Sequence, residues 1–301
     1  MRFFILTLLV CIGLQAKEHA IVYIENGSLQ SDFICESIKQ ARVFNPNTPI
    51  YFISSYLQYK KFSDFFLDQD VFFVDREALT KSPLYRSVKK GYYCPTKIGQ
   101  NAAKEDLIKS SVLKFILLYE FLKQIPLKNI FFMGQKNMLY ASLEEMIDLI
   151  FKTDKVFLAR YNSTCVSTNF MVIKDLVILE KIIAEILYTS YTSLPTLLSN
   201  FANYRSMYAE ELTSAPNEYT SSVNKGHMDW VRGIDFKNIL FDPGIHGSFL
   251  TNRAVSAECE GKPYFTHNEY TYSWEEDHKG RKIPILVFEQ KKYRLANLYL
   301  E

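Results

Sequence analysis

The sequence lacks a strong excess of charge and lacks the short motifs that identify several common enzyme classes. Its 35 Lys and Arg residues nearly balance its 33 Asp and Glu residues, so net charge gives no reason to expect a nucleic-acid partner. The chain contains no GxSxG, HExxH, P-loop or GxGxxG pattern and no CxxC pair. The sequence therefore gives no support for a serine hydrolase, a zinc-binding protein, a P-loop nucleotide-binding protein or a dinucleotide-binding enzyme.

Long apolar runs are also absent from the chain after its first residues. No later segment approaches the roughly 18 apolar residues of a membrane-spanning helix. The first residues differ, because Arg2 precedes the shorter apolar run FFILTLLVCIGL and small Ala16 follows it. This pattern predicts a signal peptide over residues 1–16, with residues 17–301 forming a single domain. We therefore expect a secreted, periplasmic or envelope-facing protein with no further membrane segment; an uncleaved anchor is the alternative.

The composition is that of a folded chain. With 301 residues, 48% of them hydrophobic and 15% aromatic, the chain can bury one large core or two modest ones and is too apolar to be disordered. Removal of the signal peptide leaves Cys35, Cys94, Cys165 and Cys259. In an exported protein these cysteines allow up to two disulfides, in three possible pairings.

Segments with strand character alternate with amphipathic helical patterns over most of the chain. Strands are expected over residues 19–25, 50–55, 70–75, 129–133, 155–160 and 167–174. Helices are expected over residues 29–44, 56–67, 104–125, 142–151 and 175–189, and a loop-rich segment over 76–103. This alternation predicts an α/β fold with a parallel sheet of βαβ units. Towards the carboxyl terminus we expect a strand, a Pro-Gly turn and a short helix within 239–250, and a hairpin formed by 270–277 and 283–288.

Several segments in the chain, taken in order, have a parallel in a known family. They are VLKFILLYEFLKQIPLKNIFF, NMLYASLEEM, TNFMVIKD, ILFDPGIHGSFL and the closing RLANLYLE. Together with the βαβ opening, they resemble a GT-A-type glycosyltransferase over most of residues 19–301. The resemblance implies a GT-A-like (Rossmann-like), mostly parallel sheet flanked by helices, with an elaborated C-terminal half. It also implies a nucleotide-sugar donor and a glycan or protein acceptor.

The same resemblance implies that the usual metal site is degenerate. In such enzymes an acidic pair, often preceded by a histidine, follows the strand that corresponds to residues 129–133, and its carboxylates hold a divalent cation against the diphosphate. Here Phe132 stands at the histidine position, and Gly134 and Lys136 stand at the acidic positions. A second histidine near the end of the family pattern is replaced by Tyr299. Both parts of one metal site are missing together, so we expect no metal cofactor.

Lys136 is the first candidate for a donor-binding residue, and its role has three interpretations. It is a solvated lysine in a surface turn, or a point charge that neutralises the diphosphate in place of the metal. Alternatively, it belongs to a site that no longer binds anything. Asn137 and Asn169 are candidates for contacts with sugar or nucleotide hydroxyls, although amides in turns usually satisfy backbone groups.

Asp242 is the candidate catalytic carboxylate. It follows an apolar strand and precedes a Pro-Gly turn, so its side chain is expected to project towards a cleft. The alternative is a turn-forming aspartate that bonds its own backbone, which is common before Pro-Gly. His246 and Gly247 lie beside it in the sequence and complete the set of predicted donor-binding residues.

Three functional hypotheses follow. The first is an exported glycosyltransferase-like protein that transfers a sugar from a nucleotide donor without a metal ion. The second is a catalytically inactive homologue that binds a glycan or a protein partner. The third is a secreted α/β protein whose resemblance to the family is distant.

Overall fold

A computed structural model provides the fold, and the predicted signal peptide lies outside the residues that it describes. Within the described part of the chain, no helix combines the length and the apolar character needed to cross a membrane. The described residues are 19–25, 32–91, 102–150, 156–162, 165–188, 198, 209–212, 238–251 and 270–300.

The centre of the fold is a seven-stranded sheet with the order β3-β2-β1-β4-β7-β6-β8. Its strands are β1 (Ala20–Ile24), β2 (Ile50–Ser54), β3 (Val71–Asp75), β4 (Ile130–Met133), β6 (Val156–Asn162), β7 (Cys165–Ile173) and β8 (Ala209–Leu212). Neighbouring strands are parallel from β3 to β4 and between β6 and β8, whereas β7 runs antiparallel to both of its neighbours. The expected α/β fold with a mostly parallel sheet is therefore confirmed.

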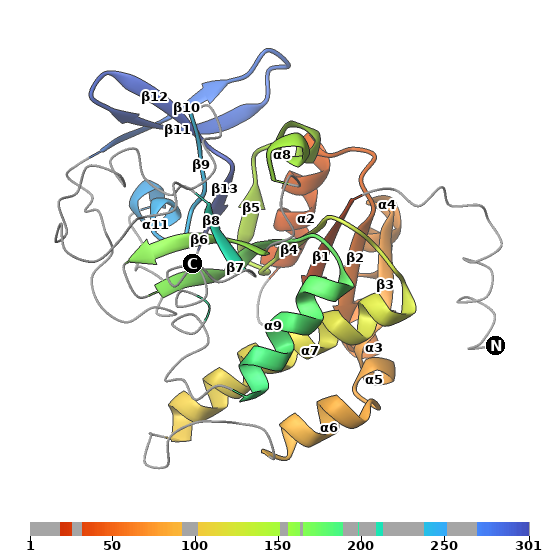
Figure 1. The fold of residues 1–301 in the computed structure, drawn as a ribbon. Helices are drawn as coiled ribbons and strands as arrows, with labels where there is room; N and C mark the ends of the chain where they lie inside the picture. The colour runs from red at the N-terminus through yellow and green to blue at the C-terminus, as the bar shows by residue number, and fades with distance from the viewer. Residues whose placement is uncertain are drawn as a thin grey trace, which may run out of the picture.

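Helices cover both faces of this sheet (Figure 1). They are α2 (Phe33–Phe44), α3 (Tyr56–Lys61), α4 (Ser63–Asp68), α5 (Arg76–Leu79), α6 (Pro83–Lys89), α7 (Ala102–Gln124), α8 (Leu143–Ile150) and α9 (Leu176–Tyr188). A further helix, α11 (His246–Thr251), packs against the C-terminal strands instead. Because side chains alternate along a strand, Val22 of β1 joins the core under α7 and α9, and Tyr23 joins the core under α2 and α8. Both faces of β1 are thus buried, which explains its continuous apolar run.

The expectation of a loop-rich segment over 76–103 is wrong for residues 76–91, which form α5 and α6. Residues 92–101 of that segment lie outside the described residues. The carboxylate of Asp75 accepts a hydrogen bond from Glu77 N at 3.0 Å, and the Ser82 hydroxyl accepts one from Tyr85 N at 3.0 Å. Each helix is therefore capped by a side chain. Pro83, which reads as a breaker in the sequence, occupies the first turn of α6, where a missing N–H costs nothing.

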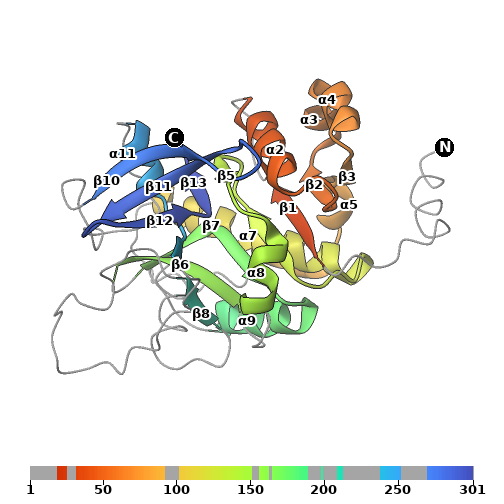
Figure 2. The ribbon, with the colours of Figure 1, turned by 90° about the horizontal axis from the view of Figure 1, so that it is seen from above.

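The C-terminal part adds two small sheets. One has the order β10-β11-β12-β9, formed by β10 (Thr271–Glu276), β11 (Lys282–Phe288), β12 (Lys291–Leu295) and β9 (Ile239–Leu240). The other pairs β13 (Asn297–Tyr299) with β5 (Asn137–Leu139) in antiparallel register. The predicted hairpin is confirmed as β10 and β11, whereas β5, β8, β12 and β13 were not foreseen. Figures 1 and 2 both place β13 and β5 between the β10–β12 strands and α2.

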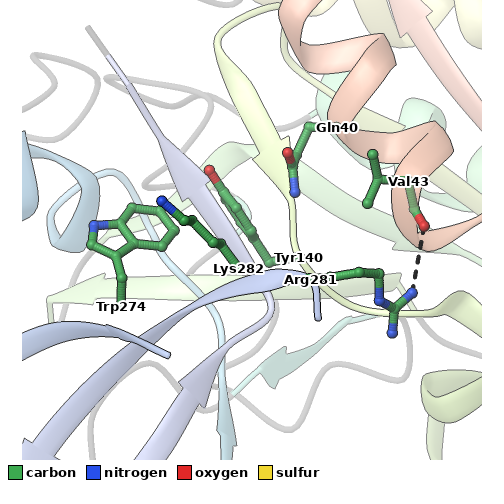
Figure 3. A pocket seen from close by; sticks show the side chains of 6 residues that line it. All are labelled: Gln40, Val43, Tyr140, Trp274, Arg281 and Lys282. Atoms are coloured by element: carbon green, nitrogen blue, oxygen red, sulfur yellow. Dashed lines mark hydrogen bonds between the residues drawn. The ribbon is translucent and has the colours of Figure 1, made fainter. Parts of the chain in front are cut away.

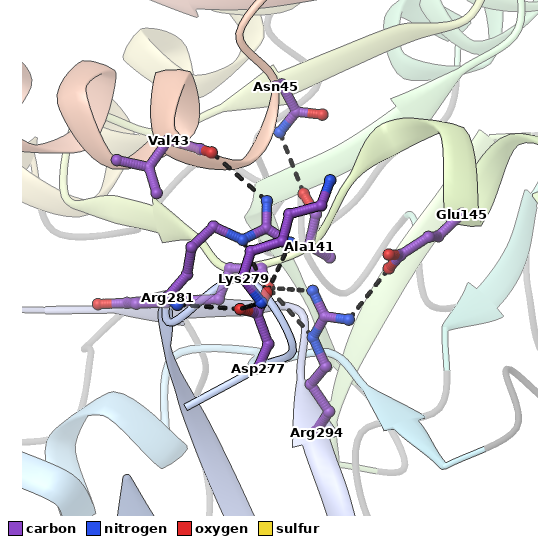
Figure 4. A network of polar contacts seen from close by, with 9 residues as sticks. Val43, Asn45, Ala141, Glu145, Asp277, Lys279, Arg281 and Arg294 are labelled. Carbon is purple, nitrogen blue, oxygen red and sulfur yellow. Dashed lines mark hydrogen bonds and ion pairs between the residues drawn. The ribbon is translucent and has the colours of Figure 1, made fainter. Parts of the chain in front are cut away.

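Two arginines fasten the four-stranded sheet to the rest of the fold (Figure 4). Arg281 donates to the carbonyl oxygen of Val43, the penultimate residue of α2, at 3.4 Å. Arg294 donates to the carbonyl oxygen of Tyr140 at 2.6 Å and pairs with Glu145 of α8 at 3.0 Å. These charge-assisted contacts set the position of the hairpin over the end of α2.

Asp277 in turn holds Arg281 and the tip of the hairpin. Its carboxylate pairs with the Arg281 guanidinium at 2.6 Å and accepts the backbone N–H groups of Lys279 and Arg281 at 2.9 Å. Burial by itself raises the pKa of Asp277, but the bonds from Arg281 and Lys279 outweigh it and hold that pKa well below its usual range.

We expect Asp277→Asn to lower the free energy of unfolding at pH 7 and to weaken its dependence on acid. A carboxyl group with a depressed folded pKa stabilises fully above its unfolded pKa of about 3.9, and this stabilisation is lost as the pH falls through the folded pKa. Urea unfolding at pH 7 and pH 3 measures both effects, with Glu276→Gln, an exposed neighbour, as the control. Identical acid dependence in wild type and Asp277→Asn would contradict this assignment.

Candidate functional site

The candidate site begins where β4 ends. Gly134 N donates to the carbonyl oxygen of Asn169 at 2.7 Å, and Asn137 N donates to the carbonyl oxygen of Gly134 at 3.0 Å. These bonds turn the chain from β4 into β5. The hydroxyl of Ser37 in α2 donates to the carbonyl oxygen of Asn137, so β5 runs back along α2. The polar stretch of the sequence is therefore a tight turn at the carboxyl edge of the large sheet.

Asn137 is a fully buried link between this turn and the C-terminal half. Its amide nitrogen donates to the carbonyl oxygen of Asn169, and its amide oxygen accepts from Asn297, both at 3.0 Å. Asn297 also exchanges two 3.1 Å hydrogen bonds with the backbone of Asp242. These contacts agree with the alternative that the Asn137 amide satisfies groups of the protein itself. A contact of Asn137 with a nucleotide-sugar donor stays a prediction.

Asp242 is 1% exposed and holds the backbone around it. Its Oδ1 atom accepts the N–H groups of Gly244, Ile245 and His246 at 2.7–2.9 Å. Its Oδ2 atom accepts those of Gly247 and Tyr299, both at 2.9 Å. A carboxylate that accepts this many backbone N–H bonds is held firmly in place. These are the contacts of the turn-forming alternative, and the catalytic role of Asp242 stays a prediction.

Gly247 and His246 pack where α11 meets β13. A Cβ atom on Gly247 would lie 2.0 Å from the carbonyl oxygen of Tyr299, so only glycine permits this approach. His246 is fully buried, and its Nδ1 atom lies 2.8 Å from the hydroxyl of Tyr272. Tyr299, which occupies the position of the expected histidine, therefore lies against Gly247 and Asp242.

Lys136 is brought to the same neighbourhood. Its carbonyl oxygen accepts a 2.9 Å hydrogen bond from Leu300 N, so the residue next to Tyr299 is fixed beside it. The Lys136 side chain is half-buried, and its ammonium makes no hydrogen bond or ion pair with the residues that the structure describes. The charge is available to an anionic ligand.

Asn169 carries an unpaired donor next to Gly134. The residue is 8% exposed, and its Nδ2 atom is buried without a hydrogen-bond partner among the described residues. A Cβ atom on Gly134 would lie 3.0 Å from the Asn169 amide oxygen, so glycine lets the two segments approach. A buried donor without a partner costs free energy.

The structure places a further polar cluster on this edge that the sequence analysis missed. Glu25 directly follows β1 and is 1% exposed. Its carboxylate accepts from the Ser54 hydroxyl at 3.1 Å and pairs with Arg76 at 3.5 Å. Since β1 and β4 are parallel neighbours, this cluster and Gly134 share one carboxyl edge, where α/β sheets bind ligands. The sequence signal that could have identified Glu25 is a charged residue directly after a buried strand, in IVYIEN.

Among the described residues, this edge does not present the clustered oxygen ligands that a divalent cation prefers. Within the described part of the chain, no group of three or more His, Cys, Asp or Glu side chains is placed to hold a metal. Both oxygens of Asp242 are engaged by backbone N–H groups, and Lys136 would repel a cation. The edge instead offers donors and a positive charge.

No protein-family model and no curated protein matches the sequence. Similar solved structures include mouse xyloside xylosyltransferase 1 (TM-score 0.45, 9% identity, 65% of this chain and 85% of that one). They also include the PaToxG glycosyltransferase (0.36, 14%, 62% and 69%). A third is a cytidylyltransferase from Leptospira borgpetersenii serovar Hardjo-bovis (0.38, 12%, 67% and 76%). At TM-scores below 0.5 these likenesses carry no argument about activity.

Asp242→Asn tests the scaffold role of Asp242. An amide nitrogen in place of either oxygen leaves at least two backbone N–H groups without an acceptor, at about 1–3 kcal/mol each. We expect the free energy of unfolding to fall by about 3 kcal/mol or more, measured by urea denaturation. The matched control is Asp175→Asn, because the Asp175 carboxylate caps α9 with one 3.1 Å bond from Ile178 N. Unchanged stability in Asp242→Asn would contradict the scaffold role.

Proposed function

We propose that this chain is a glycosyltransferase-like protein that binds the diphosphate of a nucleotide sugar at the carboxyl edge of its large sheet, without a divalent ion. The observation that carries the proposal is a pair of unsatisfied donors on two adjacent segments, the turn after β4 and the strand β7. The Asn169 amide nitrogen lacks a partner beside Gly134, and the Lys136 ammonium is unpaired two residues further on, within the described residues. Both suit phosphate oxygens.

The chemistry follows from where charge develops. In sugar transfer, an acceptor hydroxyl oxygen bonds to the anomeric carbon and loses its proton to solvent, while the bond between the anomeric carbon and the phosphate oxygen breaks. Negative charge therefore accumulates on the leaving diphosphate. A positioned ammonium group and a desolvated amide donor stabilise that charge as the bond breaks. Asp242, Asn137, His246 and Gly247 keep the β13 and α11 backbones against this turn. The Glu25–Arg76 pair adds donor and acceptor groups for the hydroxyls of the nucleoside.

A second candidate function is that of an inactive homologue that binds a glycan or a protein partner outside the cell. Cys165 is disulfide-bonded, and disulfides persist in oxidising compartments, which agrees with the proposed export. Nucleotide sugars are scarce outside the bacterial cytoplasm. An exported chain would therefore keep the fold and use its surface for binding, unless it is delivered to a host cytoplasm.

Calorimetric titration with UDP, GDP and their sugars, in EDTA and in Mn²⁺, tests the proposal. We expect binding of equal affinity in both conditions. Lys136→Ala should weaken it about tenfold or more, because hydrogen bonds to charged groups contribute about 1.5–3 kcal/mol. Asn169→Ala should weaken it by a smaller factor. The matched control is Lys128→Ala, because Lys128 is an exposed lysine at the amino end of the same strand.

Each outcome of the titration decides between the candidates. Binding that requires Mn²⁺ would overturn metal independence, and an equal loss in Lys128→Ala would show that the effect of Lys136 is one of net charge. No binding of any nucleotide in either condition would exclude the transferase proposal and leave the inactive, partner-binding homologue.

A further inference from the structure

A groove of about 330 Å³ lies between the end of α2 and the hairpin of β10 and β11. Figure 3 shows Trp274 and Lys282 at one end, Gln40 and Val43 on the α2 wall, and Tyr140 between them. Arg281 completes the lining. A volume of this size lies at the lower end of the range for small-molecule sites.

The groove is separate from the carboxyl edge. Helix α2 leads from β1 into the parallel strand β2, so its last turn, with Gln40 and Val43, returns to the amino ends of these strands. Tyr140 follows β5, which runs from the turn at Lys136 back along α2. The groove and the proposed diphosphate site therefore lie at opposite ends of β5.

The walls of the groove combine an aromatic surface with unpaired polar groups. Trp274 is 47% exposed, and its ring lies 5.5 Å from that of Tyr140, tilted by 59°. The Gln40 amide, the Tyr140 hydroxyl and the Lys282 ammonium have no hydrogen-bond or ion-pair partner in the described part of the chain. Burial raises the pKa of Tyr140 to about 12, so at neutral pH its hydroxyl is protonated and is a donor.

We propose that this groove binds a pyranose ring that carries an anionic substituent, with the apolar face of the sugar on Trp274 and the anion at Lys282. A half-exposed tryptophan ring beside hydroxyl and amide groups suits the amphipathic surface of a sugar. The face of the sugar ring is apolar and can stack on the tryptophan, whereas the hydroxyl groups on the rim of the sugar need hydrogen bonds. The Gln40 amide and the Tyr140 hydroxyl are the partners for the sugar hydroxyls.

The charge of the groove selects an acidic sugar over a neutral one. The Arg281 guanidinium is neutralised by Asp277 at 2.6 Å and also lies 4.2 Å from the centre of the Phe44 ring, so it forms a fixed wall. Lys282 makes no ion pair among the described residues, and its directly opposite neighbour on β10 is Glu276, which is exposed. Lys282 is therefore the unpaired cation of the groove lining, and a carboxylate or phosphate on the sugar would pair with it in place of water.

Fluorescence of Trp274 reports on this groove directly. The sequence has two tryptophans, so a Trp230→Phe background leaves Trp274 as the single tryptophan emitter. We expect methyl glucuronoside and glucose 6-phosphate to shift its emission in a saturable way, and methyl glucoside to bind at least threefold more weakly. Acetate and inorganic phosphate, which lack the ring, should leave the emission unchanged.

Variants in the same background test the two contacts. Lys282→Gln should reduce the affinity for both acidic sugars about threefold to tenfold, to that for methyl glucoside, because a partly exposed ion pair contributes modestly. The matched control is Lys291→Gln, an exposed lysine of the neighbouring strand outside the groove. In calorimetry, Trp274→Ala should abolish measurable binding of the acidic sugars.

The outcomes separate this site from the proposed function. Absence of a saturable shift with every sugar, equal affinity for neutral and acidic sugars, or an equal effect of Lys291→Gln would overturn the proposal. Trp274→Ala should leave nucleotide titrations unchanged, since the groove lies away from Lys136. Failure of nucleotide binding would not affect the groove, and failure of sugar binding would not affect the carboxyl edge.

Discussion

The buried carboxylate of Asp242 is the constraint on which the C-terminal half depends. Five backbone N–H groups from two separate segments converge on its two oxygens. Without it, the start of α11 and the strand β13 would bury unpaired donors, which is costly in a protein interior. Through Asn297 and Asn137 the same network reaches Asn169 and the turn after β4. The shape of the candidate site is therefore set by polar groups that a ligand need not touch.

Much of the fold could be predicted because its signals are local. The strands β1, β2 and β4 are short apolar runs between helical patterns, and their alternation indicates a parallel sheet. The β10–β11 hairpin has alternating side chains and a polar turn. Lys136 and Tyr299 could be singled out only through the resemblance of the flanking segments to a family, and Asp242 also through its place before a Pro-Gly turn. In the structure, Tyr299 N donates to the Asp242 carboxylate, and Leu300 N, the next residue along, donates to the carbonyl oxygen of Lys136.

The rest could not be predicted because it depends on contacts between distant residues. The strands β5 and β13 have three residues each, too few to show the alternating pattern of a strand. They are strands because they pair with each other. Asn297 is an ordinary amide in the sequence, and its role comes from partners 55 and 160 positions away. The close approach of Asn169 to the turn after β4 depends on the missing side chain of Gly134. None of these relations leaves a periodic signal in the chain.

The strand β5 separates two kinds of surface that the same fold presents. At its beginning, the turn with Lys136 faces the carboxyl edge, where strands end and polar side chains gather. At its end, Tyr140 faces the groove under the hairpin. At about 3.3 Å per residue, these two residues lie roughly 13 Å apart along a strand that is packed against α2. Because β5 is buried on both sides by α2 and β13, a ligand in the groove cannot reach the carboxyl edge through it. In the functions proposed here, the groove therefore holds a ligand, and the sugar transfer takes place at the other end of β5.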